Sequence, residues 1–221
     1  MKYFGREALV FLRGLKKNNR RPWFEAHREE YEQHVRQPMA DLVEEMDLRL
    51  AGFAPEMTGD PKRSVFRIHR DIRFSSDKSP YKTNAAAWFY HGDAGRGVGS
   101  TAPHGGAGFY LHIEPNESMI GGGIWMPPRP TLTRLREPSF KKRFGTLDES
   151  AMLTRMPRGY AEDHPAADLL RHQSFTVGRM LTDAELFSPK LADLLARDYA
   201  RLVPFVRWFN GALGLRTLAR R

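Results

Sequence analysis

The stretch GFYLHIEPNESMIGGGI, residues 108–124, decides the fold. Apolar and polar side chains alternate through GFYLHIEP, which is typical of a half-buried β-strand. The apolar residues of SMIGGGI indicate a second strand, and PNES between the two has the composition of a tight turn. The sequence therefore predicts an antiparallel hairpin. Gly121, Gly122 and Gly123 give its second strand a surface without side chains, which a neighbouring backbone or a ligand can approach closely.

Further strands and helices surround this hairpin. AAAWFYH and SFTVGRML predict two more strands, at residues 85–91 and 174–181. Apolar residues at three- and four-residue spacing predict helices; the expected ranges are 6–17, 22–37, 39–51, 131–136, 139–147, 164–172 and a last helix that begins at Ser188. A capping box at Thr182 and Glu185 predicts one more short helix. Grouped strands with hairpin-length links favour an α+β fold, in which a largely antiparallel sheet is packed by N- and C-terminal helices.

Length and composition limit the class of protein. A chain of 221 residues that is 41% hydrophobic supports one core, so we expect a single domain over residues 1–221. Glycine recurs through residues 92–108, which we expect to form a mobile loop. The absence of cysteine excludes disulfides, a thiolate nucleophile and zinc-thiolate sites. The N-terminal apolar run is too short and too charged for a signal peptide or membrane span, so we expect a cytoplasmic protein with no membrane partner.

The net charge is the first indication of a partner. Lysine and arginine number 35 against 26 acidic residues, a formal charge of +9, which favours contact with polyanions such as nucleic acid. The alternative interpretation is that these cations only solvate the surface. Nothing in the sequence indicates an oligomeric state.

The stretch FRIHRDIRFSSDKSPYKT, residues 66–83, concentrates this charge. Its first half predicts a strand over residues 66–74, because Phe66, Ile68 and Ile72 alternate with polar side chains. Arg70 falls on the apolar face of that strand, where an unpaired guanidinium would be strongly disfavoured. We therefore expect a structural ion pair between Arg70 and a carboxylate, with Asp77 or Glu114 as the first candidates.

The remaining polar residues of this stretch allow two interpretations. In one, Asp71 and Asp77 pair with neighbouring cations and only stabilise the turn. In the other, the stretch lines a cleft that binds a phosphate or carboxylate, because guanidinium and hydroxyl groups match the geometry of those anions. The ligand-binding candidates are Arg67, Arg73, Ser75, Lys78 and Lys82, and the candidates for proton transfer are Asp71 and Tyr81.

Three segments together resemble a known family. They are NNRRPWF at residues 18–24, RIHRDIRFSSDKSPYKT at residues 67–83 and YLHIEPNESMIGGGIWMPP at residues 110–128. The chain is similar in them to the uncharacterised family called domain of unknown function 2461. The resemblance implies no established activity, substrate or cofactor. It marks the following signature positions: Arg67, Arg70, Asp71, Arg73, Phe74, Ser75, Asp77, Lys78, Pro80, Tyr81 and Lys82.

His112 and Glu114 form a second candidate pair. They lie two residues apart on a predicted strand and share a face, a spacing that suits a metal ion or an acid with a base. A divalent metal usually needs a third protein ligand, so we expect no metal and no cofactor here.

Three functions remain open at this stage. The first is an enzyme or binding protein for a small anionic ligand in an Arg/Lys-lined cleft, the second a nucleic-acid-binding module, and the third a structural or partner-interaction domain whose signature residues form an ion-pair network. The first is preferred, because cations outnumber carboxylates in the signature stretch.

Overall fold

A five-stranded antiparallel sheet organises the computed structural model, which describes residues 1–73, 75–95, 105–127, 131–132, 152–164 and 167–217. Its strands follow one another in chain order. They are β1 (Met57–Thr58), β2 (Ala85–His91), β3 (Gly108–Ile113), β4 (Met119–Ile124) and β5 (Phe175–Met180). Helices at both ends of the chain accompany the sheet, so the predicted α+β fold with an antiparallel sheet is confirmed.

The predicted hairpin is formed by β3 and β4. Its register places Tyr110 opposite Gly121 and His112 opposite Met119. In the turn, the Ser118 hydroxyl donates to the Glu114 carbonyl oxygen at 2.9 Å and accepts from the Glu114 amide at 3.2 Å. Asn116 has a φ of 67°, a left-handed conformation that asparagine tolerates better than most residues.

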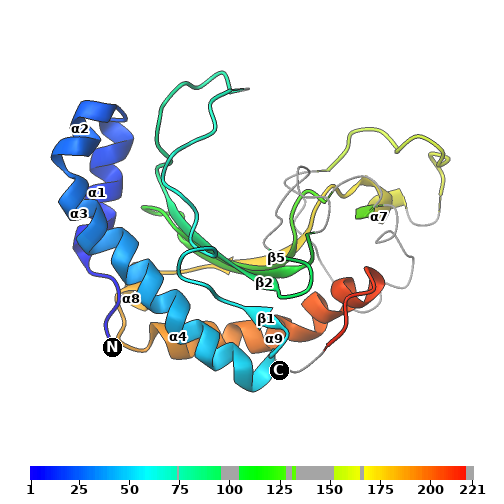
Figure 1. Ribbon diagram of the computed structural model, residues 1–221. Helices are drawn as coiled ribbons and strands as arrows, with labels where there is room; N and C mark the ends of the chain where they lie inside the picture. The colour runs from blue at the N-terminus through cyan, green and yellow to red at the C-terminus, as the bar shows by residue number, and fades with distance from the viewer. Residues whose placement is uncertain (74, 96–104, 128–130, 133–151, 165–166, 218–221) are drawn as a thin grey trace.

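Two long helices cover one face of the sheet. The helical segments are α1 (Arg6–Lys17), α2 (Arg21–Ala26), α3 (Arg28–Tyr31), the π-helical turn η1 (Glu32–Arg36), α4 (Gln37–Phe53), α7 (Ala167–Arg171), α8 (Asp183–Leu186) and α9 (Leu191–Ala212). Figure 1 shows α4 and α9 beneath the convex side of the curved sheet, with α1 to α3 stacked at one end. The Tyr199 ring of α9 stacks on the Phe109 ring of β3, with centroids 4.8 Å apart. The opposite face of the sheet is therefore not covered by α4 or α9.

The N-terminal helices differ from expectation at two points, of which the first is a break at His27, between α2 and α3, within the helix predicted over residues 22–37. The predicted buried face of α1 is confirmed, since Leu9, Leu12 and Leu15 are buried. The expected interruption at Pro38 is wrong, because a π-helical turn precedes it and the chain continues into α4. In that turn the Gln37 amide bonds to the Glu32 carbonyl oxygen, five residues back. Pro38 then occupies the first turn of α4, where its missing N–H costs little.

The predicted strand over residues 66–74 does not form. Among its described residues the segment makes one isolated bridge, of His69 with Tyr81, and a second bridge, of Val65 with Ala87, lies just before it. A regular ladder is not possible here because Pro80, which accepts a bond from the Arg70 amide, has no N–H to return. Side-chain burial nevertheless alternates as predicted, with Ile68 buried and Arg67 and His69 exposed.

Of the other predictions, the capping box is confirmed, whereas the glycine-rich loop and two of the helices lie largely outside the described residues. The capping box of Thr182 and Glu185 is present at α8. Of the predicted loop at residues 92–108, residues 96–104 lie outside the described part of the chain, and Ala107 at its end is bonded through N–H and C=O to the Asn210 side chain of α9. The helices predicted at residues 131–136 and 139–147 also lie outside the described residues, apart from residues 131–132.

Strands β4 and β5 approach each other closely at glycine. A Cβ added at Gly178 would overlap the Ile120 carbonyl oxygen and lie 3.0 Å from the Cα of Gly121. Both neighbours are backbone atoms, so the strands would have to move apart to make room.

We predict that Gly178→Ala lowers the free energy of unfolding by about 3 kcal/mol, the upper range for overpacking. Gly52→Ala is the matched control, because a Cβ at Gly52 in α4 meets no described atom within 4 Å. That control should raise stability by about 0.5 kcal/mol, as alanine does in a helix. Urea denaturation measures both, and equal effects would contradict the close approach.

Candidate functional site

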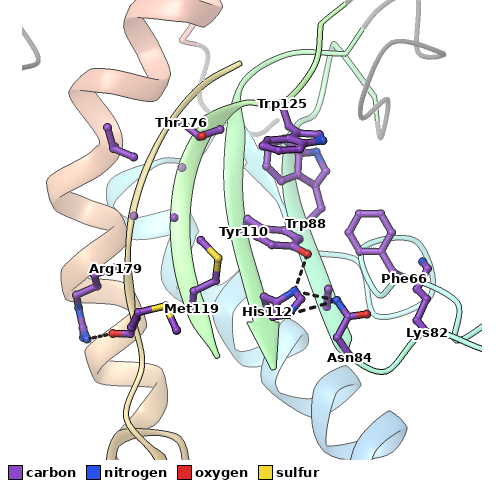
Figure 2. Close-up of a pocket in the computed structure, with 16 residues that line it drawn as sticks. Phe66, Lys82, Asn84, Trp88, Tyr110, His112, Met119, Trp125, Thr176 and Arg179 are labelled. Carbon is purple, nitrogen blue, oxygen red and sulfur yellow. Dashed lines mark hydrogen bonds between the residues drawn. The ribbon is translucent and has the colours of Figure 1, made fainter. Parts of the chain in front are cut away.

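A pocket of about 750 Å³ lies on the face of the sheet that α4 and α9 leave uncovered. Its lining residues come from β2, β3, β4 and β5, from the segment before β2 and from Trp125 just after β4 (Figure 2). The residues that line it are Phe66, Lys82, Asn84, Ala86, Trp88, Tyr110, His112, Met119, Gly121, Gly122, Trp125, Thr176, Val177, Gly178, Arg179 and Met180. The set combines aromatic rings, a few polar groups and three glycines.

Strand alternation explains how the side chains are divided between the two faces. On β3, Tyr110 and His112 line the pocket, whereas Phe109 and Leu111 are fully buried on the helix side. Tyr110 pairs with Gly121 on β4, and Gly121 pairs with Gly178 on β5. No side chain rises from those two glycines, so the floor of the pocket beside Tyr110 stays open.

A chain of polar contacts crosses one end of the pocket. The Glu114 Oε2 lies 3.2 Å from the Nε2 of His112. The Nδ1 of the same ring lies 2.8 Å from the Asn84 Nδ2 and 3.1 Å from the Tyr110 hydroxyl. Figure 2 shows the contacts of Asn84 and Tyr110 with His112 as dashed lines. A carboxylate, an imidazole and a phenol are thus linked in sequence.

The inner end of this chain is buried and charged. Glu114 is 8% exposed, and its Oε1 accepts from the Thr83 hydroxyl at 2.9 Å and from the Lys16 ammonium at 3.4 Å. Burial raises the pKa of Tyr110 to about 12, and the charge of Glu114 adds to that shift. The Tyr110 hydroxyl therefore keeps its proton at neutral pH and can act as a donor.

The outer part of the pocket carries cations and exposed apolar groups. The Lys82 Nζ lies 5.1 Å from the centroid of the Phe66 ring, a cation–π contact. Trp125 and Met180 are large apolar side chains that remain 43% and 54% exposed. Arg179 bonds to Asp198 and Glu185 on the helix side of the sheet, so its charge is already compensated.

All five predicted ligand-binding residues lie on one projecting segment. We call residues 66–73 and 75–82 the arm; it rises from the pocket side of the sheet in Figure 1. Arg73 bonds to Asp71 at 2.6 Å, and the Lys78 Nζ donates to the Ile72 carbonyl oxygen at 3.0 Å. Arg67 is exposed and Ser75 is half-buried. Of the five predicted ligand-binding residues only Lys82 lines the pocket.

Arg70 is paired with Asp77 as expected, but the pair is not buried on an apolar face, because the Asp77 side chain is 54% exposed. Bonds from Ser79 and then Arg70 lower the pKa of Asp77 to about 2. Bonds from the Arg73 side chain and backbone likewise lower the pKa of Asp71 to about 2. Glu114, the other candidate partner of Arg70, instead contacts Lys16, Thr83 and His112.

The predicted proton-transfer residues are not brought together. Asp71 is exposed on the arm beside Arg73. Tyr81 is 2% exposed and stacks on Phe24 of α2, with ring centroids 4.2 Å apart. Its backbone N–H and C=O are both bonded to the Asn19 side chain, at 3.0 and 2.9 Å.

Sequence reasoning missed Asn84, Trp88 and Tyr110 as site residues. A signal for Trp88 and Tyr110 was present, since both are large side chains at alternate positions of predicted strands, on the face opposite Phe89 and Phe109. What the sequence did not show is which face the helices cover.

The fold and the pocket together define a class: an α+β protein with an aromatic pocket on the uncovered face of an antiparallel sheet. The chain belongs to the conserved hypothetical protein family DUF2461, whose sequence model matches residues 7–208. No curated protein and no solved structure matches the chain. In the described residues no three His, Asp or Glu side chains gather as a metal site, and no helix is long and apolar enough to cross a membrane.

We predict that Tyr110 makes stability fall at alkaline pH. Its pKa is raised from 10.0 to about 12 in the folded chain, so its contribution is fully present below pH 10 and is lost as pH rises toward 12. Tyr110→Phe removes this ionisation. Between pH 9 and pH 12 the variant should lose about 2 kcal/mol less stability than the wild type.

Denaturant midpoints at each pH measure this difference. Tyr31, whose pKa is also raised to about 12, contributes equally in both proteins and cancels in the comparison. Tyr160→Phe is the matched control, because Tyr160 is half-buried outside the pocket. Parallel curves for Tyr110→Phe and the wild type would show that Tyr110 is not shielded from solvent.

Proposed function

We propose that this protein binds a small organic acid with a planar apolar body, on the uncovered face of its sheet. The observation that carries the proposal is the combination of aromatic walls with Lys82, Asn84 and Tyr110 in the lining of a single pocket. A volume of about 750 Å³ falls within the range of small-molecule sites.

The walls favour a flat apolar body. Phe66, Trp88, Tyr110 and Trp125 contribute rings to the pocket, and the Phe66 and Tyr110 rings meet edge to face, with centroids 6.3 Å apart. Aromatic side chains prefer stacked or edge-to-face partners, which a planar ligand supplies. The glycine floor at Gly121 leaves room for such a ligand to lie against the sheet.

The polar side of the pocket favours a negative group. Lys82 supplies a positive charge, and the Asn84 amide, which has a second N–H besides the one near His112, supplies a hydrogen-bond donor. The indole Nε1 of Trp88 is buried and has no hydrogen-bond partner among the described residues. A ligand oxygen that accepts from it would remove the cost of that unpaired donor.

This proposal keeps the small anionic ligand expected from the sequence and moves its binding site. Of the predicted ligand-binding residues Lys82 lines the pocket, whereas Arg73 and Lys78 lie elsewhere on the arm. The nucleic-acid function rests on the net charge and on the basic residues Lys141, Lys142 and Arg143, which lie outside the described residues, and steep salt dependence of binding would support it. A cytoplasmic location, supported by the absence of cysteine, also remains a proposal.

We predict that 2-naphthoate binds to the protein and that Lys82→Met weakens its binding about 10-fold, a loss of about 1.4 kcal/mol. The neutral isostere 2-naphthamide should bind the wild type and Lys82→Met equally, because it has no charge for Lys82 to attract. Isothermal titration calorimetry measures all four affinities.

Two further variants locate the anion site. Lys190→Met removes a lysine at the start of α9, outside the pocket, and should leave the affinity for 2-naphthoate unchanged. Lys78→Met tests the arm. A loss for Lys78→Met as large as that for Lys82→Met would place the anion on the arm, and no binding of 2-naphthoate to the wild type would refute the proposed ligand class.

A further inference from the structure

The contacts among Glu114, His112 and Tyr110 amount to more than a binding surface. We propose that these residues form a proton relay and that the pocket is the active site of an enzyme acting on aryl-substituted 2-oxo acids. The reaction is transfer of a proton to and from the carbon beside the ketone. This inference rests on the proposed function, since it requires an organic acid in the same pocket.

The hydrogen bonds of His112 set its tautomer. The Asn84 Nδ2 lies 2.8 Å from the His112 Nδ1 and 3.4 Å from its Nε2, so its contact alone does not set the tautomer. An ionised carboxylate can only accept, so the His112 Nε2 that lies 3.2 Å from the Glu114 Oε2 carries the proton of the neutral ring and donates it to that oxygen. As a result, a basic nitrogen of His112 faces the Tyr110 hydroxyl at 3.1 Å.

These contacts occur in the order that activates a hydroxyl group, here that of Tyr110, for proton transfer. A hydroxyl in the pocket is bonded to a base, and the base is oriented by a carboxylate on its other side. The carboxylate is itself fixed, because Thr83 and Lys16 bond to the oxygen that His112 does not use. Glu114 does not line the pocket, so its role is to position His112 and to stabilise the imidazolium that forms.

The proposed step balances without any further reactant. The Tyr110 oxygen takes a proton from the substrate carbon while its own proton passes to the His112 Nδ1. The electron pair of the broken C–H bond moves to the ketone oxygen, which becomes an enolate. Lys82 stabilises that negative charge, and Glu114 stabilises the imidazolium. Return of a proton along the same path restores the ketone and the resting enzyme.

The pocket selects the substrate class. A carboxylate suits Lys82, an aryl group suits the ring walls formed by Trp88 and Trp125, and a ketone between them gives the neighbouring carbon an acidic hydrogen. An enolate conjugated with an aryl ring is planar, so it fits flat walls better than the tetrahedral carbon of the ketone form. The pocket thereby favours the intermediate over the substrate.

The test uses phenylpyruvate, which contains all three groups. Its C3 protons are followed by proton NMR in heavy water, where enolisation replaces them with deuterium. The full-length wild type should exchange them faster than buffer, and Tyr110→Phe and His112→Gln should each lower the enzymatic rate at least 100-fold, within the range for acid–base catalysis. Tyr160→Phe and His34→Gln are matched controls outside the pocket and should keep the wild-type rate.

The Glu114→Gln variant tests whether Glu114 positions His112 for catalysis or only supports the fold. Loss of its charge makes the imidazolium harder to form, so the acid limb of the rate profile should move to lower pH. Tyr110, Lys82 and, through Glu114, Lys16 are the other titratable groups around His112, and all are kept in this variant. A lower rate with an unmoved acid limb would overturn the positioning role.

Displacement of bound 2-naphthoate by phenylpyruvate keeps the two proposals distinguishable. Displacement without exchange above the buffer rate would overturn the relay and leave the binding function standing. Exchange that survives in both Tyr110→Phe and His112→Gln would also overturn the relay. Failure of phenylpyruvate to displace 2-naphthoate would overturn the 2-oxo acid class. A cooperative urea denaturation transition for each variant shows that it is folded.

Discussion

The buried carboxylate of Glu114 is the interaction on which the rest of the site depends. Taking such a charge out of water costs several kcal/mol unless partners surround it. Its partners come from three places in the chain: Lys16 at the end of α1, Thr83 after the arm, and His112 on β3. Satisfying one charge therefore ties the first helix, the base of the arm and the central hairpin together at the polar end of the pocket.

The pocket itself follows from an asymmetry of the sheet. Both long helices pack on one face, so Phe109 and Leu111 are buried there while Tyr110 and His112 face the other way. An uncovered face would normally be filled by larger side chains. Here β4 and β5 present glycine beside Tyr110, and the close approach of their backbones excludes any larger residue. The close approach of β4 and β5 therefore requires glycine, and glycine leaves the floor of the pocket open beside Tyr110.

The sequence predicted the elements better than it predicted the site. Strands β2 to β5, the hairpin turn and the capping box at Thr182 follow from local patterns, and local patterns are what a sequence displays. The arm failed as a strand because Pro80 lies in its partner segment, 10 residues after Arg70 in the chain. His112 and Glu114 were recognised as a pair, but their links to Asn84 and Lys16 are long-range contacts. No spacing in the sequence encodes such contacts.

The position of Lys82 gives a physical explanation for the long signature motif. Adjacent residues of an extended chain point to opposite sides. Tyr81 points toward α2, where Phe24 stacks on its ring and Asn19 bonds both of its backbone groups. Lys82 must then point the other way, over the Phe66 ring and into the pocket. The Arg70–Asp77 and Arg73–Asp71 pairs stabilise the far part of the arm. Most of the charged residues of the motif therefore form contacts within the arm. The arm in turn positions Lys82, the cation of the motif that lines the pocket.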